Sequence, residues 1–385
     1  MRAPDLAVIV TSFEMPWHLR RALESIAGQR TNLQLEVVVA DDGSTDETVE
    51  VVKDFATEAP FPVRFVTHPH GEFHAARCRN EGVRHSSAPQ LLFFDGDCLL
   101  PPDHIECHRQ AWRPGVTTCS YCVRFDQAVS AQATIDAVRS GQFNSWAPQP
   151  QRSKLRSMHL KSLIYNLIGH RTKPSFRSTD FFMAREEYLR INGFDENFRG
   201  WGCEDDDFGR RLRAAGVKTV SVLNRTCVYH LWHPPAPTRP QEWKRGANVA
   251  YLQRPIRLTR CIHGVAPRRP YELTVRLAGL ASDSVAVRRV LAAHGWIIEL
   301  APQVQTDVEL LCRPGSGRFS GRSDCRILAI LDDQFERIDT SQAQVVLSER
   351  GTVGQPGQVR LRLDDADGLW AVLQGREFFV FRAAA

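Results

Sequence analysis

The stretch LLFFDGDC occupies residues 91–98. Four consecutive apolar residues are typical of a strand that is buried on both faces inside a parallel sheet. The run ends at two carboxylates, Asp95 and Asp97, and open α/β sheets bind their ligands at the carboxyl ends of such strands. Two acids are costly there unless a positive charge compensates them, and a divalent cation that bridges to a phosphate is the natural candidate. Gly96 keeps the turn narrow, so that backbone and ligand can approach closely.

Two earlier apolar runs also end in polar residues. Leu6–Val10 leads into Thr11 and Phe13, and Leu35–Ala40 leads into the acid-rich segment Asp41–Asp46. Apolar residues at helical spacing follow each of these strands, so strands and helices alternate along the chain. This alternation predicts an α/β fold with a doubly wound, mostly parallel sheet and a nucleotide at its carboxyl edge.

Composition sets broad limits on the function. The chain has 385 residues, enough for two domains, and its 43% hydrophobic and 24% charged residues are typical of a soluble globular protein. A net charge of +5 does not by itself indicate nucleic acid, and we expect no such partner. We find no run of the roughly 18 apolar residues that a membrane span needs. The first residues run directly into a strand without a signal peptide, so we expect a cytoplasmic protein.

Four segments of the first half resemble, in order and spacing, the motifs of family 2 glycosyltransferases. They are Val10–Phe13, Val39–Asp46, Ala76–Gly82 and Phe94–Cys98. The resemblance implies the nucleotide-sugar fold called GT-A, a Rossmann-like and mostly parallel sheet. It also implies an enzyme that transfers a sugar from a nucleotide sugar.

Three downstream segments extend this resemblance. Ile191–Glu196 and Gly200–Asp207 look like the acceptor-side motif of bacterial chondroitin-polymerase-type, galactosyltransferase and polypeptide N-acetylgalactosaminyltransferase enzymes. Tyr229–Pro234 resembles the closing metal-histidine motif. The resemblance covers about Asp5 to Pro235. Because several motifs occur in the family's order, it is more specific than any one of them.

We expect two domains. Residues 1–262 form the GT-A domain, with a nucleotide-sugar half at about 1–125 and an acceptor half at about 126–262. After a linker rich in glycine and proline, residues 263–385 form a smaller α+β or β-rich accessory domain of unknown role. Within it we expect one helix, at 284–294. The strands expected there are 272–277, 296–300, 308–312, 326–331, 345–347, 359–363 and 377–381.

The resemblance implies a metal centre built on the Asp-x-Asp (DXD) motif. Asp97 should ligate the metal, and Asp95 should contact the ribose or reach the metal through water. His230 should supply a further ligand, and His233 competes with it because it lies three residues later. A histidine ligand favours Mn²⁺ over Mg²⁺, which prefers oxygen ligands, although Mg²⁺ is possible.

The resemblance also implies how the donor binds. The base should lie near Thr11, Phe13 and the Asp41–Asp42 pair, where a carboxylate can accept a hydrogen bond from a pyrimidine imino group. A UDP-sugar is therefore the leading expectation. Which acid makes this contact is open, since Asp42 could instead only cap the turn. Either of two arginines could reach the diphosphate. The full set of expected donor-binding residues is Thr11, Phe13, Asp41, Asp42, Arg77, Arg79, Asp95 and Gly96.

On the acceptor side, Asp205 matches the family's base, which takes the proton of the attacking hydroxyl and leads to inversion at the anomeric carbon. Glu204 beside it should hold acceptor hydroxyls, although acids in the first turn of a helix can also simply favour the helix dipole. Trp201 looks like a sugar-stacking platform, and Gly202 after it leaves the loop mobile. We also expect Asp180 to contact the acceptor. It stands where the family usually has asparagine, on the acceptor-side strand, and its extra charge leaves the donor sugar in doubt.

The segment 151–177 is basic and amphipathic. It contains seven lysines and arginines and no acidic residue, with leucines and isoleucines interleaved. Such a segment suits an anionic surface, such as a membrane face, a lipid-linked acceptor or an acidic polysaccharide, and would place the protein peripherally at the inner face of a membrane. The interpretation that we prefer is a solvated helix whose apolar side packs on the core. The two interpretations are compatible.

The sequence therefore predicts an inverting, metal-dependent glycosyltransferase that acts on a hydroxyl of a glycan or lipid-linked acceptor, in surface polysaccharide synthesis. A nucleotidyltransferase is an alternative, but it would not need the block Trp201–Asp207. A non-catalytic sugar-binding protein is a second alternative, but it would be expected to lose Asp97 or Asp205. The donor sugar, the acceptor, the linkage and the oligomeric state are not encoded in any motif that we find.

Overall fold

The structure is a computed structural model. It describes residues 2–170, 172–235, 246–254, 256–279, 297–299, 305–312, 319–330, 340–348, 358–362 and 365–375. The chain forms two compact units, Met1–Trp243 and Lys244–Ala385. The division falls earlier than the expected 262/263 boundary, because Ile256, Leu258 and Ile262 pack in the core of the C-terminal unit.

The N-terminal unit alternates strands and helices along most of its length. Its strands are β1 (Leu6–Ser12), β2 (Leu35–Asp41), β3 (Val63–Val66), β4 (Gln90–Asp95), β5 (Cys98–Leu99), β6 (Val116–Cys119), β7 (Cys122–Arg124), β8 (Asp180–Ala184), β9 (Lys218–Ser221) and β10 (Val228–His230). Its helices are α1 (Pro16–Ala27), α2 (Thr48–Glu58), α3 (Ala75–Arg84), α4 (His104–Ala111), α5 (Gln127–Ala131), α6 (Ile135–Arg139), the 3₁₀ helix η1 (Gln142–Ser145), α7 (Gln149–Leu167), α8 (Arg185–Arg190) and α9 (Glu204–Ala214).

Seven of these strands form one mixed sheet, in the order β3-β2-β1-β4-β8-β6-β9. The pairs β1–β2, β1–β4, β2–β3 and β6–β9 are parallel, whereas β8 runs antiparallel to both of its neighbours. The order reverses between β1 and β4, and such a switch point opens a crevice at the carboxyl ends of the strands. Thr11 and Asp95 pair across this point. The prediction of a mostly parallel α/β sheet is confirmed.

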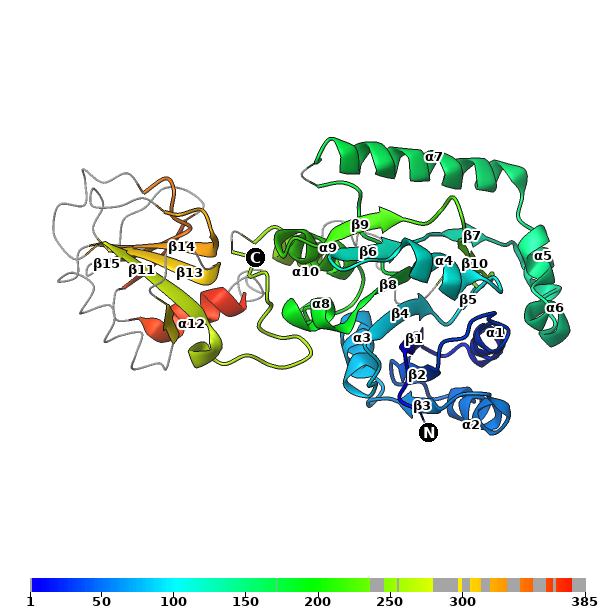
Figure 1. The fold of residues 1–385 in the computed structure, drawn as a ribbon. Helices are drawn as coiled ribbons and strands as arrows, with labels where there is room; N and C mark the ends of the chain where they lie inside the picture. Colours follow the sequence, from blue (N-terminus) through cyan, green and yellow to red (C-terminus); the bar gives the residue numbers. More distant parts are fainter. Residues whose placement is uncertain are drawn as a thin grey trace. The chain divides into compact units, whose positions relative to one another are not determined.

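Helices cover both faces of this sheet, with α1 and α2 on one side and α3, α8 and α9 on the other (Figure 1). The central strands are buried on both faces, as their continuous apolar sequences predict, and all seven residues of β2 are buried. Two glycines allow close backbone packing. A Cβ on Gly82 of α3 would lie 2.3 Å from Cγ2 of Ile9, and one on Gly96 would lie 2.7 Å from the Thr11 carbonyl oxygen.

A second, three-stranded sheet has the order β5-β10-β7. Its pairing register sets His230 opposite Cys98, the residue that follows Asp97. The backbone N–H of Leu231 donates to the carbonyl oxygen of Asp97 at 2.9 Å. This small sheet thus holds the segment with His230 next to the Asp-Gly-Asp turn, although more than 130 residues separate the two segments in the sequence.

The C-terminal unit contains a six-stranded sheet in which all five pairs are parallel. Its strands, in spatial order, are β12 (Ile297–Glu299), β11 (Thr274–Gly279), β13 (Thr306–Cys312), β14 (Ser323–Ile330), β15 (Val345–Ser348) and β16 (Val359–Arg362). The described helices are α10 (Ala247–Leu252), the 3₁₀ helix η3 (Pro270–Glu272) and α12 (Ala366–Gln374). A small domain with a further sheet is confirmed. The expected helix at 284–294 and strand at 377–381 lie outside the described residues.

We predict that Gly82→Val lowers the free energy of unfolding of the N-terminal unit by about 1–3 kcal/mol, because the new methyl groups must displace Ile9 and part α3 from β1. Urea unfolding followed by tryptophan fluorescence measures this change. Gly71→Ala is the matched control, since the nearest atom to its new Cβ lies 3.9 Å away. Equal unfolding midpoints for the two variants would contradict this account of the packing.

Candidate active site

The predicted metal ligands meet at the end of the Asp-Gly-Asp turn. Nε2 of His230 and Nε2 of His233 each lie 3.3 Å from the same oxygen, Oδ2 of Asp97. Burial alone would raise the pKa of Asp97, but hydrogen bonds with the two histidines outweigh it and hold that pKa well below the usual range. The carboxylate is therefore ionised, as a cation ligand must be. The structure brings both candidate histidines to Asp97 instead of selecting one.

The ring orientation of His233 suits a cation. Its Nδ1 lies 2.7 Å from the carbonyl oxygen of Pro234, and a carbonyl can only accept, so Nδ1 carries the proton. Nε2 faces Asp97, and its hydrogen bond to that carboxylate raises the pKa of His233, so a cation that binds here would replace the Nε2 proton. Such a backbone hydrogen bond is how metal-ligating histidines are commonly oriented. One carboxylate and two imidazoles form a donor set that Mn²⁺ accepts, so the residues present fit the expected ion.

Asp95 faces a different partner. Oδ1 of Asp95 accepts from Thr11 Oγ1 at 3.0 Å and from Nη2 of Arg79 at 3.2 Å. Arg79 also lies 3.5 Å from Oε1 of Glu204 on α9. Burial raises the pKa of Asp95 to about 6, with a further rise from Asp97, while Arg79 opposes the shift. The guanidinium of Arg79 thus joins the Asp-Gly-Asp turn to the acceptor-side acids.

Arg79 is held in place by the motif around it. It is only 4% exposed and lies over the ring of Phe194, 5.2 Å from its centroid. The neighbouring Asn80 is fully buried, donates to the Phe194 carbonyl and accepts from Tyr188 Oη and the Phe194 N–H. These bonds fix α3 against the loop before Glu204. The sequence segment 76–82 therefore links the two halves of the site.

The four acids at the start of α9 have different surroundings. Asp207 is fully buried and pairs with Arg211 at 2.6 Å, so it stabilises the fold, while Asp206 is exposed. Asp205 is partly buried, and burial, with the charges of Glu204 and Asp206, raises its pKa to about 7. A carboxylate with such a pKa is matched to taking a proton near neutral pH.

Trp201 is half-buried, and its ring stacks on Phe73 with centroids 5.1 Å apart. The backbone around it is tightly curved, with φ values of +70° at Gly200 and +89° at Gly202. Glycine favours this left-handed region, so the two glycines allow the loop to bring Trp201 against Phe73. The predicted platform is thus supported on one face by an aromatic ring.

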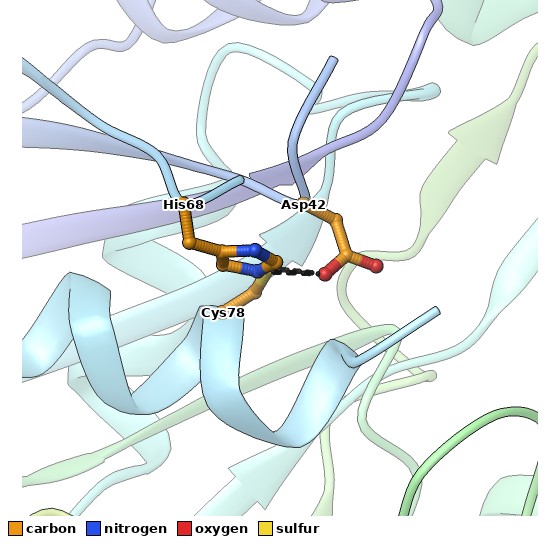
Figure 2. Close-up of side chains that lie close together, drawn as sticks. All are labelled: Asp42, His68 and Cys78. Carbon is orange, nitrogen blue, oxygen red and sulfur yellow. Dashed lines mark hydrogen bonds and ion pairs between the residues drawn. The ribbon is translucent and has the colours of Figure 1, made fainter. Parts of the chain in front are cut away.

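On the donor side, the structure separates the roles of the two neighbouring acids. Asp41 holds the turn, because its carboxylate accepts from the N–H of Gly43, the N–H and hydroxyl of Ser44, and the hydroxyl of Thr67. The idea that Asp42 only caps this turn is wrong. Asp42 points instead to a histidine and a cysteine that no motif had singled out, His68 and Cys78 (Figure 2).

The remaining donor-side candidates differ in availability. Arg79 is committed to two carboxylates, whereas Arg77 is half-buried and has no ion pair or hydrogen bond with the described residues. Phe13 is half-buried and stacks on His70, with centroids 5.7 Å apart. Gly96 is buried and donates its N–H to the Thr11 carbonyl oxygen, so its close approach is to strand β1. Of the two arginines, Arg77 is the more available for a ligand.

The expectation that Asp180 contacts the acceptor is wrong. Asp180 is fully buried, with Oδ1 3.0 Å from Nε2 of His104 and Oδ2 3.1 Å from Nε2 of His108. The distal nitrogens of both rings meet hydroxyls, Thr226 and Thr118, at 2.8 Å. A hydroxyl can donate to Nδ1, so both neutral rings can donate Nε2–H to Asp180 and every group is satisfied. The negative charge serves the core between β8 and α4.

The sequence interpretation also missed His18. Its ring lies 5.9 Å from that of His233, and its Nε2 lies 3.0 Å from the Trp232 carbonyl oxygen. His18 lies in the first turn of α1 and belongs to none of the recognised motifs, so no sequence signal marked its position. Through Trp232 it supports the loop that carries His233.

Comparisons with known proteins agree with this geometry. Residues 7–170 match the model of glycosyl transferase family 2, and residues 159–234 match a domain described as the N-terminal domain of galactosyltransferase. The N-terminal unit belongs to glycosyltransferase family 2. The resemblance drawn from the motifs is confirmed, and the two matches meet within α7.

The chain is also similar to curated proteins that are named as a glucosyltransferase and as glycan synthases. A validoxylamine A glucosyltransferase of Streptomyces hygroscopicus subsp. jinggangensis is 30% identical over 233 residues, which cover 57% of this chain and 54% of the relative. A chondroitin synthase of Escherichia coli is 23% identical and a hyaluronan synthase of Pasteurella multocida 24%, each over 63% of this chain. The alignments span 37% and 26% of those two proteins. The chain thus spans about half or less of the length of these relatives.

Solved structures show more distant similarity. The mannosyltransferase PcManGT of Pyrobaculum calidifontis, in complex with GDP-Man and Mn²⁺, is 18% identical with a TM-score of 0.41, over 65% of this chain and 62% of that one. GalNAc-T7 with UDP, GalNAc and Mn²⁺ is 15% identical with a TM-score of 0.46, over 65% and 48%.

We predict that His233→Ala weakens Mn²⁺ binding at least about ten-fold, because it removes a nitrogen that faces Asp97. Titration with Mn²⁺ followed by electron paramagnetic resonance measures the free ion directly. His85→Ala is the control, since this half-exposed histidine lies at the end of α3. Unchanged affinity in the His233 variant would exclude it as a ligand.

Proposed function

We propose that this chain is an inverting, metal-dependent glycosyltransferase that moves a sugar from a nucleoside diphosphate sugar to an acceptor hydroxyl. The observation that carries the proposal is the arrangement at the sheet edge. Asp97 with its two histidines is separated from Asp95 by Gly96 alone. Arg79 pairs with both Asp95 and Glu204, and Glu204 is the neighbour of Asp205. The Asp97 centre, which would bind the metal ion and the leaving diphosphate, thus lies near Asp205, the candidate base for the acceptor.

The donor half of the proposal assigns a task to each group. Asp97, His230 and His233 would hold the divalent ion, preferably Mn²⁺, which supplies Lewis-acid stabilisation of the diphosphate charge. Arg77 would bind the phosphate oxygens, because a guanidinium can donate two parallel hydrogen bonds to a phosphate. Phe13 offers a ring beside the turn of Asp41 and Asp42, where a uracil base would stack. UDP is the favoured nucleotide.

On the acceptor side, Asp205 would accept the proton of the attacking hydroxyl. A sugar hydroxyl is a weak nucleophile, and a carboxylate within hydrogen-bond reach can remove its proton as the new bond forms. Glu204, tied to Arg79, is placed to hold neighbouring acceptor hydroxyls, and Trp201 on Phe73 to support a sugar ring. Direct displacement with the base on the acceptor side inverts the anomeric carbon.

The acceptor class rests on the relatives. The names chondroitin synthase and hyaluronan synthase point to polysaccharide synthesis, whereas validoxylamine A glucosyltransferase names a different acceptor. We propose a glycan or lipid-linked glycan as the acceptor, in the synthesis of a surface polysaccharide. The C-terminal unit, with its parallel sheet, is proposed as an accessory domain.

The test of the proposal is a donor screen. The purified chain is incubated with Mn²⁺ and a panel of nucleotide sugars, and nucleoside diphosphate release is followed by mass spectrometry. We expect slow release from one UDP-sugar, lost on chelation and in Asp97→Asn. Release that persists in Asp97→Asn would contradict the metal centre. No release from any donor, together with no thermal shift by UDP plus Mn²⁺, would contradict the proposed activity.

The pH dependence of transfer gives a second prediction. A base acts only when deprotonated, so kcat/KM should fall as the pH drops below about 7, the raised pKa of Asp205. Asp205→Asn should lower kcat about 10²–10⁴-fold with little effect on UDP binding. Asp206→Asn is the control for kcat above pH 7, because this exposed neighbouring acid has no assigned part in proton transfer; loss of its charge should move the fall in kcat/KM to lower pH. An Asp205→Asn enzyme with near-normal kcat would exclude this base.

Helix α7 supports a proposal about the partner surface. Five apolar side chains at helical spacing are strongly exposed: Leu160 (60%), Leu163 (46%), Ile164 (55%), Leu167 (87%) and Ile168 (63%). The helix packs through other residues, with Leu155 and Ser162 buried and Asn166 bonded to the Thr219 carbonyl. The interpretation that the interleaved apolar side packs on the core is therefore wrong for these five. Figure 1 shows α7 lying along the outside of the N-terminal unit, next to β9.

We assign this exposed stripe to an anionic membrane surface that presents the acceptor. The helix carries Arg152, Lys154, Arg156 and Lys161 and no acid, so its charge complements anionic lipid. No helix among the described residues is both long and apolar enough to cross a bilayer. The proposed contact is therefore a peripheral one.

We expect the full chain to co-sediment with vesicles that contain phosphatidylglycerol. The double variant Leu163→Glu, Leu167→Glu should bind these vesicles more than about ten-fold more weakly, because burial of each leucine side chain contributes about 1.5 kcal/mol or more of binding free energy. Leu189→Glu is the matched control, an exposed leucine on α8. No binding by the unaltered chain, or equal binding by both variants, would contradict the membrane assignment.

A further inference from the structure

A pocket of about 200 Å³ lies between α7, the strands β6 and β9, and the segment 173–177 that precedes β8. It shares no residue with the Asp97 centre or with the acids that begin α9. Its volume is more than ten times the roughly 10–15 Å³ that one water molecule requires, so a group as large as a phosphate fits. The side chains around it divide into an exposed basic rim and a buried polar floor.

The rim carries three positive charges, from Lys161 on α7 and from Lys173 and Arg177. Within the described part of the chain, no aspartate or glutamate lines the pocket and none of the three cations forms an ion pair. Nζ of Lys173 lies 2.7 Å from the hydroxyl of Ser175. The guanidinium of Arg177 lies over the ring of Tyr121, 4.6 Å from its centroid. The charge on the rim is therefore uncompensated and attracts an anion.

The floor offers hydroxyl groups. Ser120, directly after β6, is only 3% exposed, and among the described residues its Oγ has no hydrogen-bond partner. A buried hydroxyl without a partner is costly, and an anionic oxygen in the pocket would accept its hydrogen bond. Burial raises the pKa of the neighbouring Cys119 thiol, so this group is neutral and adds no negative charge. Two further buried hydroxyl residues, Ser162 and Thr219, also line the pocket.

The exposed apolar stripe of α7 borders the rim. Ile164 and Ile168 follow Lys161 by three and seven residues, so these three side chains share one side of the helix. Met158 and Tyr165 lie on the side that lines the pocket. A ligand with its anionic group in the pocket can therefore place a hydrocarbon chain along the stripe.

The number of cations indicates the kind of anion. A diphosphate that links a lipid to a sugar has two ionised phosphates, whereas the phosphodiester of a membrane headgroup has one, and a sugar carboxylate also carries a single charge. Three cations on the rim match the diphosphate best, because each can form a charge-assisted hydrogen bond with a phosphate oxygen. A free acidic polysaccharide would leave the apolar stripe unused.

The rim is also joined to the candidate active site. Two residues after Arg177, the carbonyl oxygen of Thr179 accepts the backbone N–H of Asp95 at 3.3 Å. The ring of Phe176 packs on Phe208 of α9, with centroids 5.0 Å apart, and α9 begins with the acceptor-side acids. The basic segment is thus held between the Asp-Gly-Asp turn and the helix that carries the candidate base.

We propose that this pocket binds the diphosphate of a lipid-linked glycan whose hydrocarbon chain lies along the exposed stripe of α7. The attached sugar then supplies the acceptor hydroxyl. The inference rests on the proposed function and narrows the acceptor to one chemical class, a sugar joined through diphosphate to a lipid. The phosphodiester of bulk membrane lipid is the competing source of phosphate.

The test is co-sedimentation of the full chain with phosphatidylcholine vesicles that carry either polyprenyl diphosphoglucose or phosphatidylglycerol, adjusted to equal zeta potential. EDTA is present, so that no metal ion at Asp97 bridges to the diphosphate. We expect tighter binding to the diphosphate vesicles, and a loss of this preference by at least about ten-fold in the double variant Lys161→Gln, Arg177→Gln. The matched control is Lys154→Gln, Arg156→Gln, which removes two exposed cations of α7 that do not line the pocket.

Ser120→Ala supplies a test that leaves the charge unchanged. It should weaken binding to the diphosphate vesicles about two- to ten-fold and leave binding to the phosphatidylglycerol vesicles unchanged. Circular dichroism establishes that each variant is folded. A thermal shift with UDP and Mn²⁺ reports the donor site separately, so diphosphate-selective binding in a chain without that shift would support the pocket and contradict the transferase.

Two results would overturn the inference. Equal effects of the two double variants on the diphosphate vesicles would show that the pocket has no part in binding. Equal weakening on both kinds of vesicle by Lys161→Gln, Arg177→Gln, beyond that of the control, would assign the pocket to the headgroups of bulk membrane lipid.

Discussion

The buried guanidinium of Arg79 is the interaction on which the site depends. Asp95 and Glu204 come from opposite halves of the N-terminal unit, and without a cation between them their charges would repel and their burial would be costly. Arg79 is itself positioned by its stack on Phe194 and by the hydrogen bonds of Asn80. The sequence motif predicts that Arg79 contacts phosphate. In the structure, Arg79 instead connects the donor side of the site to the acceptor side.

The partner of the distal ring nitrogen separates the histidines of the Asp97 centre from those of the core. At His233 that partner is a backbone carbonyl, which accepts from Nδ1 and turns Nε2 toward Asp97. At His104 and His108 it is a hydroxyl, and Asp180 accepts both Nε2–H groups in a satisfied core network. The same residue types therefore form a proposed cation site at one edge of the sheet and a packed network in its interior.

Much of the fold followed from sequence patterns, because buried parallel strands have continuous apolar runs and their polar ends mark the ligand edge. The convergence of Asp97 with His230 and His233 followed from motif order. Asp180 was misplaced because a substitution at a motif position does not reveal that two histidines of α4 surround it as hydrogen-bond partners. The exposed face of α7 could not be predicted either. Apolar residues at helical spacing are compatible with a core-facing or a surface-facing stripe, and only the packing of α7 on the rest of the unit distinguishes the two.

We propose that Asp97 and the two histidines hold the ion that binds the donor diphosphate. Crystals soaked with Mn²⁺ and UDP, with diffraction recorded on both sides of the manganese absorption edge, would locate that ion. We expect an anomalous peak within bonding distance of Asp97 Oδ2 and Nε2 of His233, with the diphosphate against that ion. A manganese peak on the diphosphate but away from Asp97 and both histidines would contradict it.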